Sequence, residues 1–230
     1  MNALPVDYVE LGFRSLNSNG FKGGCAYTTD NFIEQLQVPK GLNLGVMINA
    51  SEIINYKEGL TVALSKLFGP AKCSPLTLVR IACHFNELER ALPSCAWLKE
   101  MGYEVGINLM QISENTREEV ERISYLASKY SLNVLYFADS LGSMTPERTS
   151  EIIKNLRSYW NGPLGIHTHD NMGNAMDNSL KAISDGVTWI DSTVTGMGRG
   201  PGNLQTEYLV IEIAELKNIS LKIKPLLSII

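Results

Sequence analysis

The sequence predicts an α/β protein of the (β/α)8 TIM-barrel type, in which seven of the eight strand–helix units are present and the N-terminal strand is missing. Seven short apolar runs alternate with segments of helical periodicity. The 230 residues approach the roughly 250 typical of such a barrel, and no Pro/Ser-rich linker divides them. We therefore expect one barrel domain over residues 1–230. Polar residues gather after the apolar runs, at the end where barrels place their active sites.

The expected strands start about 24–36 residues apart, which is the span of one strand–helix unit. Start signals precede two of the intervening helices: Ser113-Glu114-Asn115 before one and Thr145-Pro146-Glu147 before another. Regular alternation of this kind predicts a parallel sheet covered by helices. In chain order the expected strands are 6–13, 42–49, 76–83, 103–110, 132–139, 162–169 and 186–194.

An open, doubly wound dinucleotide-binding fold is the other parallel α/β architecture that this pattern allows. That fold needs a G-x-G-x-x-G turn directly after the first strand. The one glycine-dense turn, "GMGRGPGN" at 196–203, follows the last expected strand and has Pro201 in place of the third glycine. The barrel is therefore favoured over dinucleotide binding.

Composition narrows the classes of partner. The net charge is −4 without long single-sign runs, which argues against nucleic acid and against an acidic membrane surface. No stretch approaches the roughly 20 apolar residues of a membrane span. The four cysteines show no C-x-x-C spacing, which favours reduced thiols in the cytoplasm. Small-molecule chemistry is the expected function.

The segment "GIHTHDNMGN" at 165–174 carries two of the three histidines. His167 and His169 lie two apart on an expected strand, so they project to the same side, where both can bind one ion. Hydrogen bonding to loop backbone is the alternative role for the pair. Two imidazoles with open positions suit a divalent ion that also binds an oxygen-rich substrate. Asp170 alternates away from the pair, so we expect it to orient a ligand or to cap the helix that follows.

These motifs carry a family resemblance. Residues 165–209, with the H-x-H strand and the glycine-rich final loop, resemble the superfamily of metal-dependent pyruvate aldolases, hydroxymethylglutaryl-CoA lyases and isopropylmalate synthases. Residues 79–113 and 136–147 are most similar to the 4-hydroxy-2-oxovalerate aldolase branch. The resemblance implies that His167 and His169 are metal ligands and that the ion is Mn²⁺ or Mg²⁺ rather than Zn²⁺. It also matches Asn203 to a loop asparagine that can reach the ion; an N-cap of the last helix is the alternative.

The chain departs from the superfamily at its start. Members begin with a strand that carries Thr-x-Arg-Asp, whose aspartate is the third metal ligand, and this chain contains no such motif. We consider three explanations: a misassigned start codon, a strand supplied by another polypeptide, or a degenerate gene. For the chain as written we expect weak aldolase turnover or none.

The implied reaction is a metal-assisted aldol cleavage of a 4-hydroxy-2-oxoacid to pyruvate and an aldehyde, or the reverse condensation. Arg199 could pair with an anionic substrate group, and Gly198 and Gly200 would let backbone approach the substrate or simply form a tight loop. His84 is the candidate for proton transfer, with a structural role as its alternative.

Two acids complete the candidate site: Glu10 and Asp139 end expected strands and would support the ligand histidines or anchor loops. An acyl-CoA lyase or acyltransferase of the same superfamily is an alternative function. A non-catalytic barrel fragment, or a subunit completed by a partner, is another. Because the chain stops at Ile230, without the further helical domain of aldolases that work with a dehydrogenase, such a partner is not expected. A homo-oligomer stays open.

Overall fold

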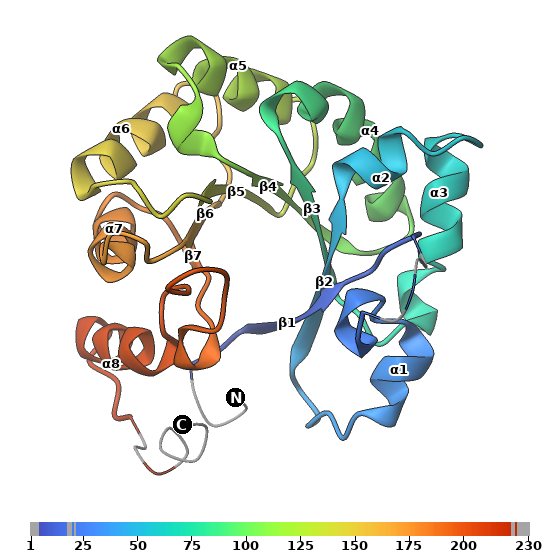
Figure 1. Ribbon diagram of the computed structural model, residues 1–230, viewed down its shortest axis with the longest axis horizontal. Helices are drawn as coiled ribbons and strands as arrows, with labels where there is room; N and C mark the ends of the chain where they lie inside the picture. The colour runs from blue at the N-terminus through green and yellow to red at the C-terminus, as the bar shows by residue number, and fades with distance from the viewer. Residues whose placement is uncertain (1–4, 18–19, 21, 222–223, 225–230) are drawn as a thin grey trace.

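A computed structural model describes residues 5–17, 20, 22–221 and 224. Its sheet has seven strands hydrogen-bonded in sequence order, and every neighbouring pair is parallel. The strands curl around a common axis with the helices outside them (Figure 1). The strands are β1 (Tyr8–Phe13), β2 (Asn43–Asn49), β3 (Leu78–Cys83), β4 (Glu104–Leu109), β5 (Val134–Asp139), β6 (Leu164–Thr168) and β7 (Trp189–Ile190).

Eight α-helices lie in the described ranges, and most of them follow a strand. Short 3-10 turns precede several of them, among them those at Phe85–Glu87 and Val194–Gly196. The helices are α1 (Asp30–Gln35), α2 (Ala50–Ile54), α3 (Leu60–Leu67), α4 (Leu88–Glu100), α5 (Arg117–Ala127), α6 (Pro146–Leu156), α7 (Ala175–Ser184) and α8 (Thr206–Leu216).

The arrangement is a partial (β/α)8 barrel, as the sequence predicts. All seven expected strands form, and β7 is shorter than expected because only Trp189 and Ile190 pair with β6 before the chain turns into the 3-10 segment. One helix start differs from the expectation. Ser113 lies in a 3-10 turn, and the N-cap of α5 is Thr116, which exchanges hydrogen bonds with Glu119 in a capping box.

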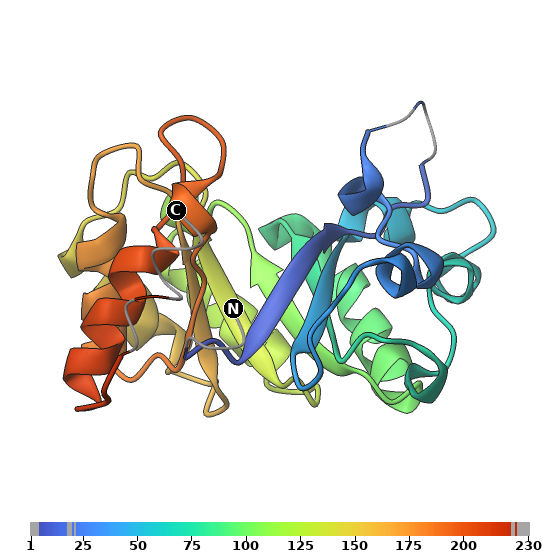
Figure 2. The ribbon, with the colours of Figure 1, turned by 90° about the horizontal axis from the view of Figure 1, so that it is seen from below.

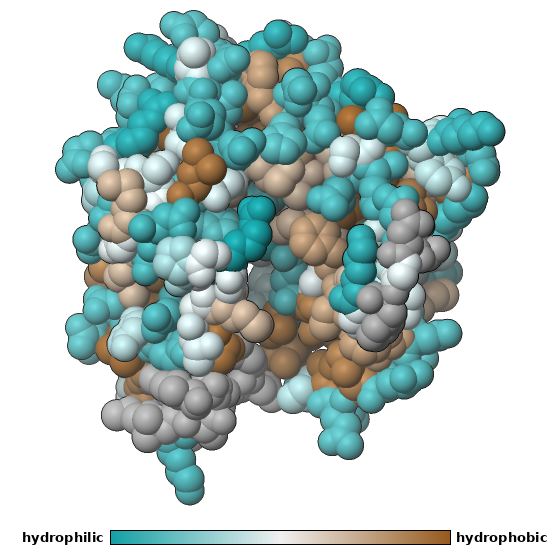
Figure 3. All heavy atoms as spheres, in the orientation of Figure 1, coloured by the Kyte–Doolittle hydropathy of each residue, from teal (hydrophilic) through white to brown (hydrophobic). Residues whose placement is uncertain are grey.

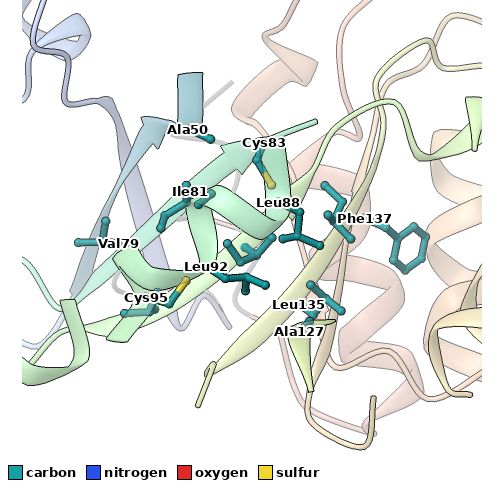
Figure 4. Close-up of a cluster of buried hydrophobic side chains, with 14 of the residues drawn as sticks. Ala50, Val79, Ile81, Cys83, Leu88, Leu92, Cys95, Ala127, Leu135 and Phe137 are labelled. Carbon is teal, nitrogen blue, oxygen red and sulfur yellow. The ribbon is translucent and has the colours of Figure 1, made fainter. Parts of the chain in front are cut away.

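Alternation along each strand separates two environments. On β3 the side chains of Val79, Ile81 and Cys83 point toward the helices and are fully buried. Figure 4 shows Ile81 and Cys83 on the side of the sheet that carries Leu88 and Leu92 of α4, and all of these residues belong to the apolar layer between sheet and helices. The intervening side chain of Arg80 points to the inside of the curled sheet instead. The inner face is therefore where polar chemistry can be placed.

The two edge strands do not pair with each other among the described residues, which leaves the barrel open between β7 and β1. Side chains nevertheless meet across this opening. The rings of Tyr8 and Trp189 stack with centroids 4.6 Å apart, and the Tyr8 hydroxyl donates to Glu104 on β4 at 2.6 Å. An aromatic contact thus takes the place of a backbone ladder at this edge.

The C-terminal ends of the strands lie on one side of the molecule, together with the loops that follow them (Figure 2). Backbone bonds tie three of these loops: Met172 donates to the Gly142 carbonyl and Asp170 to that of Gly202. Seen from this side, the surface has a central depression bordered by hydrophilic and hydrophobic residues (Figure 3). No helix in the part of the chain that the structure describes is long and apolar enough to cross a membrane.

Candidate metal site at the strand ends

The two histidines of the H-x-H motif come together at the end of β6. Their ring centroids are 5.2 Å apart at an interplanar angle of 76°. The intervening Thr168 points the other way and shares a hydrogen bond with Ser179 on α7, so strand alternation places both imidazoles on the inner face. His169 is 9% exposed, and the side chain of His167 is 22% exposed. His169 is therefore buried and His167 is partly exposed.

The His167 ring is fixed by a neighbour that follows β7. Its Nδ1 lies 3.0 Å from Oδ2 of Asp191. The same oxygen accepts from Nη1 of Arg80 at 2.7 Å, and Nε of Arg80 donates to Glu10 at 2.6 Å. Three strands and the segment after β7 therefore contribute to one hydrogen-bonded chain of polar groups inside the barrel.

The surroundings of the histidine pair favour a neutral His169 ring and an ionised Asp191 carboxylate. Burial lowers the pKa of His169, with a further contribution from His167 and Arg199, to about 4. Burial alone would raise the pKa of Asp191, but the Arg80 guanidinium and the His167 ring outweigh it and hold this pKa well below its usual range. At neutral pH, His169 is uncharged, which is the form in which imidazole binds metals.

Asn203 lies beside His169, since the two residues form an antiparallel bridge. Its Nδ2 donates to the Met197 carbonyl at 3.3 Å, while its buried Oδ1 has no partner in the described structure. The N-cap of α8 is Gln205, so the alternative in which Asn203 caps this helix is wrong. A buried amide oxygen without a donor, on the residue bridged to His169, is a group that a bound cation would satisfy.

The glycine-rich loop is shaped around this asparagine. A Cβ on Gly198 would lie 2.7 Å from Asn203 Oδ1, and a Cβ on Gly202 would lie 2.1 Å from the Gly196 carbonyl oxygen. Gly200 adopts a φ of +60°, beside the amide oxygen of Asn171. The glycines therefore permit the loop to fold back on Asn203. Arg199, on the same loop, is exposed.

Asp139 and Asp170 accept hydrogen bonds from backbone N–H groups and not from the histidine rings in the described structure. Asp139 is fully buried, and its carboxylate accepts from the backbone N–H groups of Ser143 and Met144 at 3.1 and 3.0 Å, so it anchors the loop after β5. Asp170 accepts at 2.9 Å from the backbone N–H of Ala175, the first residue of α7, so it satisfies a donor at the start of this helix, whose N-cap position is Asn174. Of the alternatives considered for each, the structure shows loop anchoring for Asp139 and a hydrogen bond to the helix start for Asp170.

The remaining predicted residues lie farther from the pair. His84 follows β3, its side chain is exposed, and its backbone N–H donates to the Glu87 carboxylate at 2.9 Å. No hydrogen bond connects it to the other two histidines in the described part of the chain. Glu10 reaches His167 only through Arg80 and Asp191. His84 as a proton donor or acceptor stays a prediction.

Sequence reasoning gave no role to Arg80 or Asp191. Arg80 is a charge in the otherwise apolar run "LTLVRIAC", which is the signal that could have identified it. In the described residues, no group of three or more His, Cys, Asp and Glu side chains is arranged to hold a metal ion. The predicted ligands, which are the two imidazoles and the Asn203 amide oxygen, therefore include no carboxylate.

The sequence of this chain matches a known protein family. A family model described as HMGL-like matches residues 73–228, which include both histidines and the loop asparagine. The chain belongs to the HMGL-like family. This membership confirms the resemblance that the H-x-H strand and the final loop indicate in the sequence.

Curated relatives of this HMGL-like protein include two 4-hydroxy-2-oxovalerate aldolases. That of Carboxydothermus hydrogenoformans is 32% identical over 94% of this chain and 62% of its own length. That of Pelotomaculum thermopropionicum is 38% identical over 57% of this chain and 39% of its own length. The chain therefore spans less than two thirds of the length of these relatives.

Solved structures show the same fold. The N-terminal domain of a candidate aldolase from Bacteroides vulgatus superposes with a TM-score of 0.84 at 29% identity, covering 99% of this chain and 74% of that one. A hydroxymethylglutaryl-CoA lyase from Pseudomonas aeruginosa superposes with a TM-score of 0.75 at 17% identity, covering 99% and 80%. The second likeness shows the fold alone.

Proposed function

We propose that this HMGL-like protein carries the metal and oxoacid site of a carbon–carbon lyase. Its substrate is a 4-hydroxy-2-oxoacid, which it cleaves to pyruvate and an aldehyde, or forms in the reverse condensation. The observation that carries the proposal is the pair His167 and His169, with Asn203 bridged to His169 and its buried Oδ1 unpartnered in the described structure. Curated relatives named 4-hydroxy-2-oxovalerate aldolase support this substrate class over an acyl-CoA.

His167, His169 and Asn203 would hold the ion, and their mixed nitrogen and oxygen donors suit Mn²⁺ or Mg²⁺ in the presence of an oxygen-rich substrate. When bound, a divalent ion supplies Lewis-acid stabilisation of the negative charge that develops on the oxoacid as the carbon–carbon bond breaks. A carboxylate ligand has to come from outside the described side chains. The opening between β7 and β1 is the place where a further strand would bring one to the histidines.

The chain's own residues then bind and orient the substrate. Arg199, exposed on the loop next to His169, pairs with the substrate carboxylate. Gly198 and Gly200 keep side chains out of the space between that loop and Asn203. His84 moves the proton of the 4-hydroxyl group from the far side of the mouth. The four free cysteines accord with action in the cytoplasm.

The function is tested by coupling pyruvate release from 4-hydroxy-2-oxovalerate to NADH oxidation by lactate dehydrogenase. We expect slow turnover that needs added Mn²⁺, because the ligand set lacks a carboxylate, and that falls below detection in His167→Ala. Asp185→Asn is the matched control, since its carboxylate pairs with Lys181 on the surface of α7. Turnover that is the same without metal and in His167→Ala would contradict the proposed function, and no turnover at any metal concentration would favour a non-catalytic barrel.

A further inference from the structure

Arg80 is a buried charge inside the described part of the barrel. Its side chain is 5% exposed, and the guanidinium lies 4.4 Å from the centre of the Tyr136 ring. Two carboxylates contact it: Glu10 on β1 and Asp191 after β7. β1 and β7 are the two edge strands of the sheet. Arg80 on β3 uses two of its three guanidinium nitrogens to bind a carboxylate on β1 and a carboxylate directly after β7.

Oδ2 of Asp191 is shared between two groups. Nη1 of Arg80 donates to it at 2.7 Å, and Nδ1 of His167 lies 3.0 Å from it. A carboxylate oxygen only accepts, so this contact is favourable only when Nδ1 of His167 carries the proton. The neutral ring then has its lone pair on Nε2. That tautomer is the one that can bind a metal through Nε2.

We propose that Asp191 and Arg80 are positioning residues: Asp191 holds His167 in the Nδ1–H tautomer with Nε2 free, and Arg80 holds Asp191 in place. An arginine serves here because its planar fork can donate to two carboxylates at once from a fixed position. A lysine ammonium on a flexible stem can reach one of them. The consequence for metal binding rests on the proposed function, whereas the tautomer itself does not.

The tautomer is measured in the unaltered protein by long-range proton–nitrogen correlation spectra at mildly alkaline pH, where imidazoles are neutral. The chain has three histidines, so three ring systems appear, and His84→Gln and His169→Gln assign them. We expect the proton of the His167 ring on Nδ1. A ring protonated on Nε2 would overturn the proposal.

Asp191→Asn is the deciding variant. It leaves one acceptor oxygen, which Arg80 retains, so the Nδ2 group turns toward His167 and moves the ring proton to Nε2. We expect this tautomer change and a ten- to hundredfold loss of Mn²⁺ affinity, measured by the electron paramagnetic resonance signal of free Mn²⁺. An unchanged tautomer and an unchanged Mn²⁺ affinity in the folded variant would overturn the proposal.

Arg80→Lys tests the second positioning residue. We expect a mixture of His167 tautomers and a smaller loss of Mn²⁺ affinity than in Asp191→Asn; a wild-type spectrum would overturn the role of Arg80. Arg80→Gln, which keeps one donor toward Asp191, replaces this variant if circular dichroism shows that it does not fold.

Asp185→Asn and Arg122→Lys are the controls: the Arg122–Glu89 pair is exposed, and Asp185 bonds to Lys181 and Ser150 and not to His167, Asp191 or Arg80. Both should keep the wild-type spectrum and the wild-type Mn²⁺ affinity. If the unaltered protein binds no Mn²⁺, the proposed function fails, while the position of the ring proton still decides this proposal.

Discussion

The positions of the predicted metal ligands are determined by local structure for the two histidines and by a distant loop for Asn203. His167 and His169 reach one face by strand alternation alone. Asn203 reaches them because a loop without Cβ atoms at its tight points folds back on His169. A single added methyl group can therefore test how the loop contributes to the site.

Gly198→Ala places a Cβ 2.7 Å from Oδ1 of Asn203. We expect the Asn203 side chain to move away from the histidines and the affinity for Mn²⁺ to fall about tenfold, with little loss of stability because the loop is exposed. Isothermal titration calorimetry with Mn²⁺ measures the effect. Gly69→Ala is the matched control, because a Cβ there meets nothing within 4 Å. Equal affinities in the two variants would show that Asn203 is not a ligand.

Residue-scale prediction from sequence succeeded where the signal is local and failed where it is not. The spacing of His167 and His169 is sufficient to predict that they share a face. The roles of Arg80 and Asp191 depend on contacts across 111 residues of sequence, which no local pattern encodes. The contact of Asp170 with the start of α7 was among the alternatives because it follows from its place before a helix.

At the scale of elements, alternation along β3 and the packed face of α4 decide which thiols meet water. Cys83 on β3 and Cys95 on α4 are buried, and burial raises the pKa of both thiols; that of Cys95 reaches about 12. Cys25 and Cys73 lie in exposed 3-10 turns. The reactive thiols should therefore belong to turns and the unreactive ones to the core.

Ellman's reagent should modify two of the four thiols quickly in the native protein and all four in guanidinium chloride. Cys25→Ser and Cys73→Ser should each remove one fast-reacting thiol, and Cys95→Ser none. Rapid modification of a third thiol under native conditions would show that the layer between sheet and helices is not closed as described.

Element boundaries followed from sequence to different degrees. The apolar runs predict each strand within a few residues because burial on both sides makes these runs continuous. The sequence predicts that α5 starts at Ser113, whereas its N-cap is Thr116. Both residues are of a type that caps helices, so the local sequence does not distinguish between them. The last strand was predicted too long: only Trp189 and Ile190 of the run at 186–194 pair with β6, and Thr193 forms a bridge with Gln205 instead.

For the molecule as a whole, the opening between β7 and β1 is the main departure from a closed barrel. The seven strands of the described sheet could be predicted from the count of apolar runs. The contacts that cross the opening could not, since Tyr8 and Trp189 are 181 positions apart in the numbering and read as ordinary core aromatics. Their energy can be measured.

A double-mutant cycle with Tyr8→Ala and Trp189→Ala should give a coupling free energy of about 0.5–1.5 kcal/mol, the range for stacked aromatic pairs. Unfolding in urea followed by circular dichroism supplies the four free energies. Tyr125→Ala with Trp189→Ala is an unpaired control, and it should show coupling near zero. A coupling near zero for Tyr8 and Trp189 would mean that the edges are held together by other contacts.

Stability at high pH should also report on this edge. Burial and the hydrogen bond to Glu104 raise the pKa of Tyr8 to about 12, above its value of about 10 in the unfolded chain. Its contribution to the free energy of unfolding is complete below pH 10 and is lost as the pH rises toward 12, because the unfolded chain releases the proton first. Urea unfolding should show the difference between wild type and Tyr8→Phe shrinking over this range. A difference that is constant from pH 9 to 12 would contradict the raised pKa.

Binding of Mn²⁺ at the histidine pair is the measurement that tests the central claim most directly. A titration followed by electron paramagnetic resonance, in the presence of pyruvate, should show Mn²⁺ bound to the wild-type protein and released in the His167→Ala/His169→Ala double variant. Circular dichroism should show both proteins folded. Equal Mn²⁺ binding by the two proteins, or none by the wild type, would contradict the account.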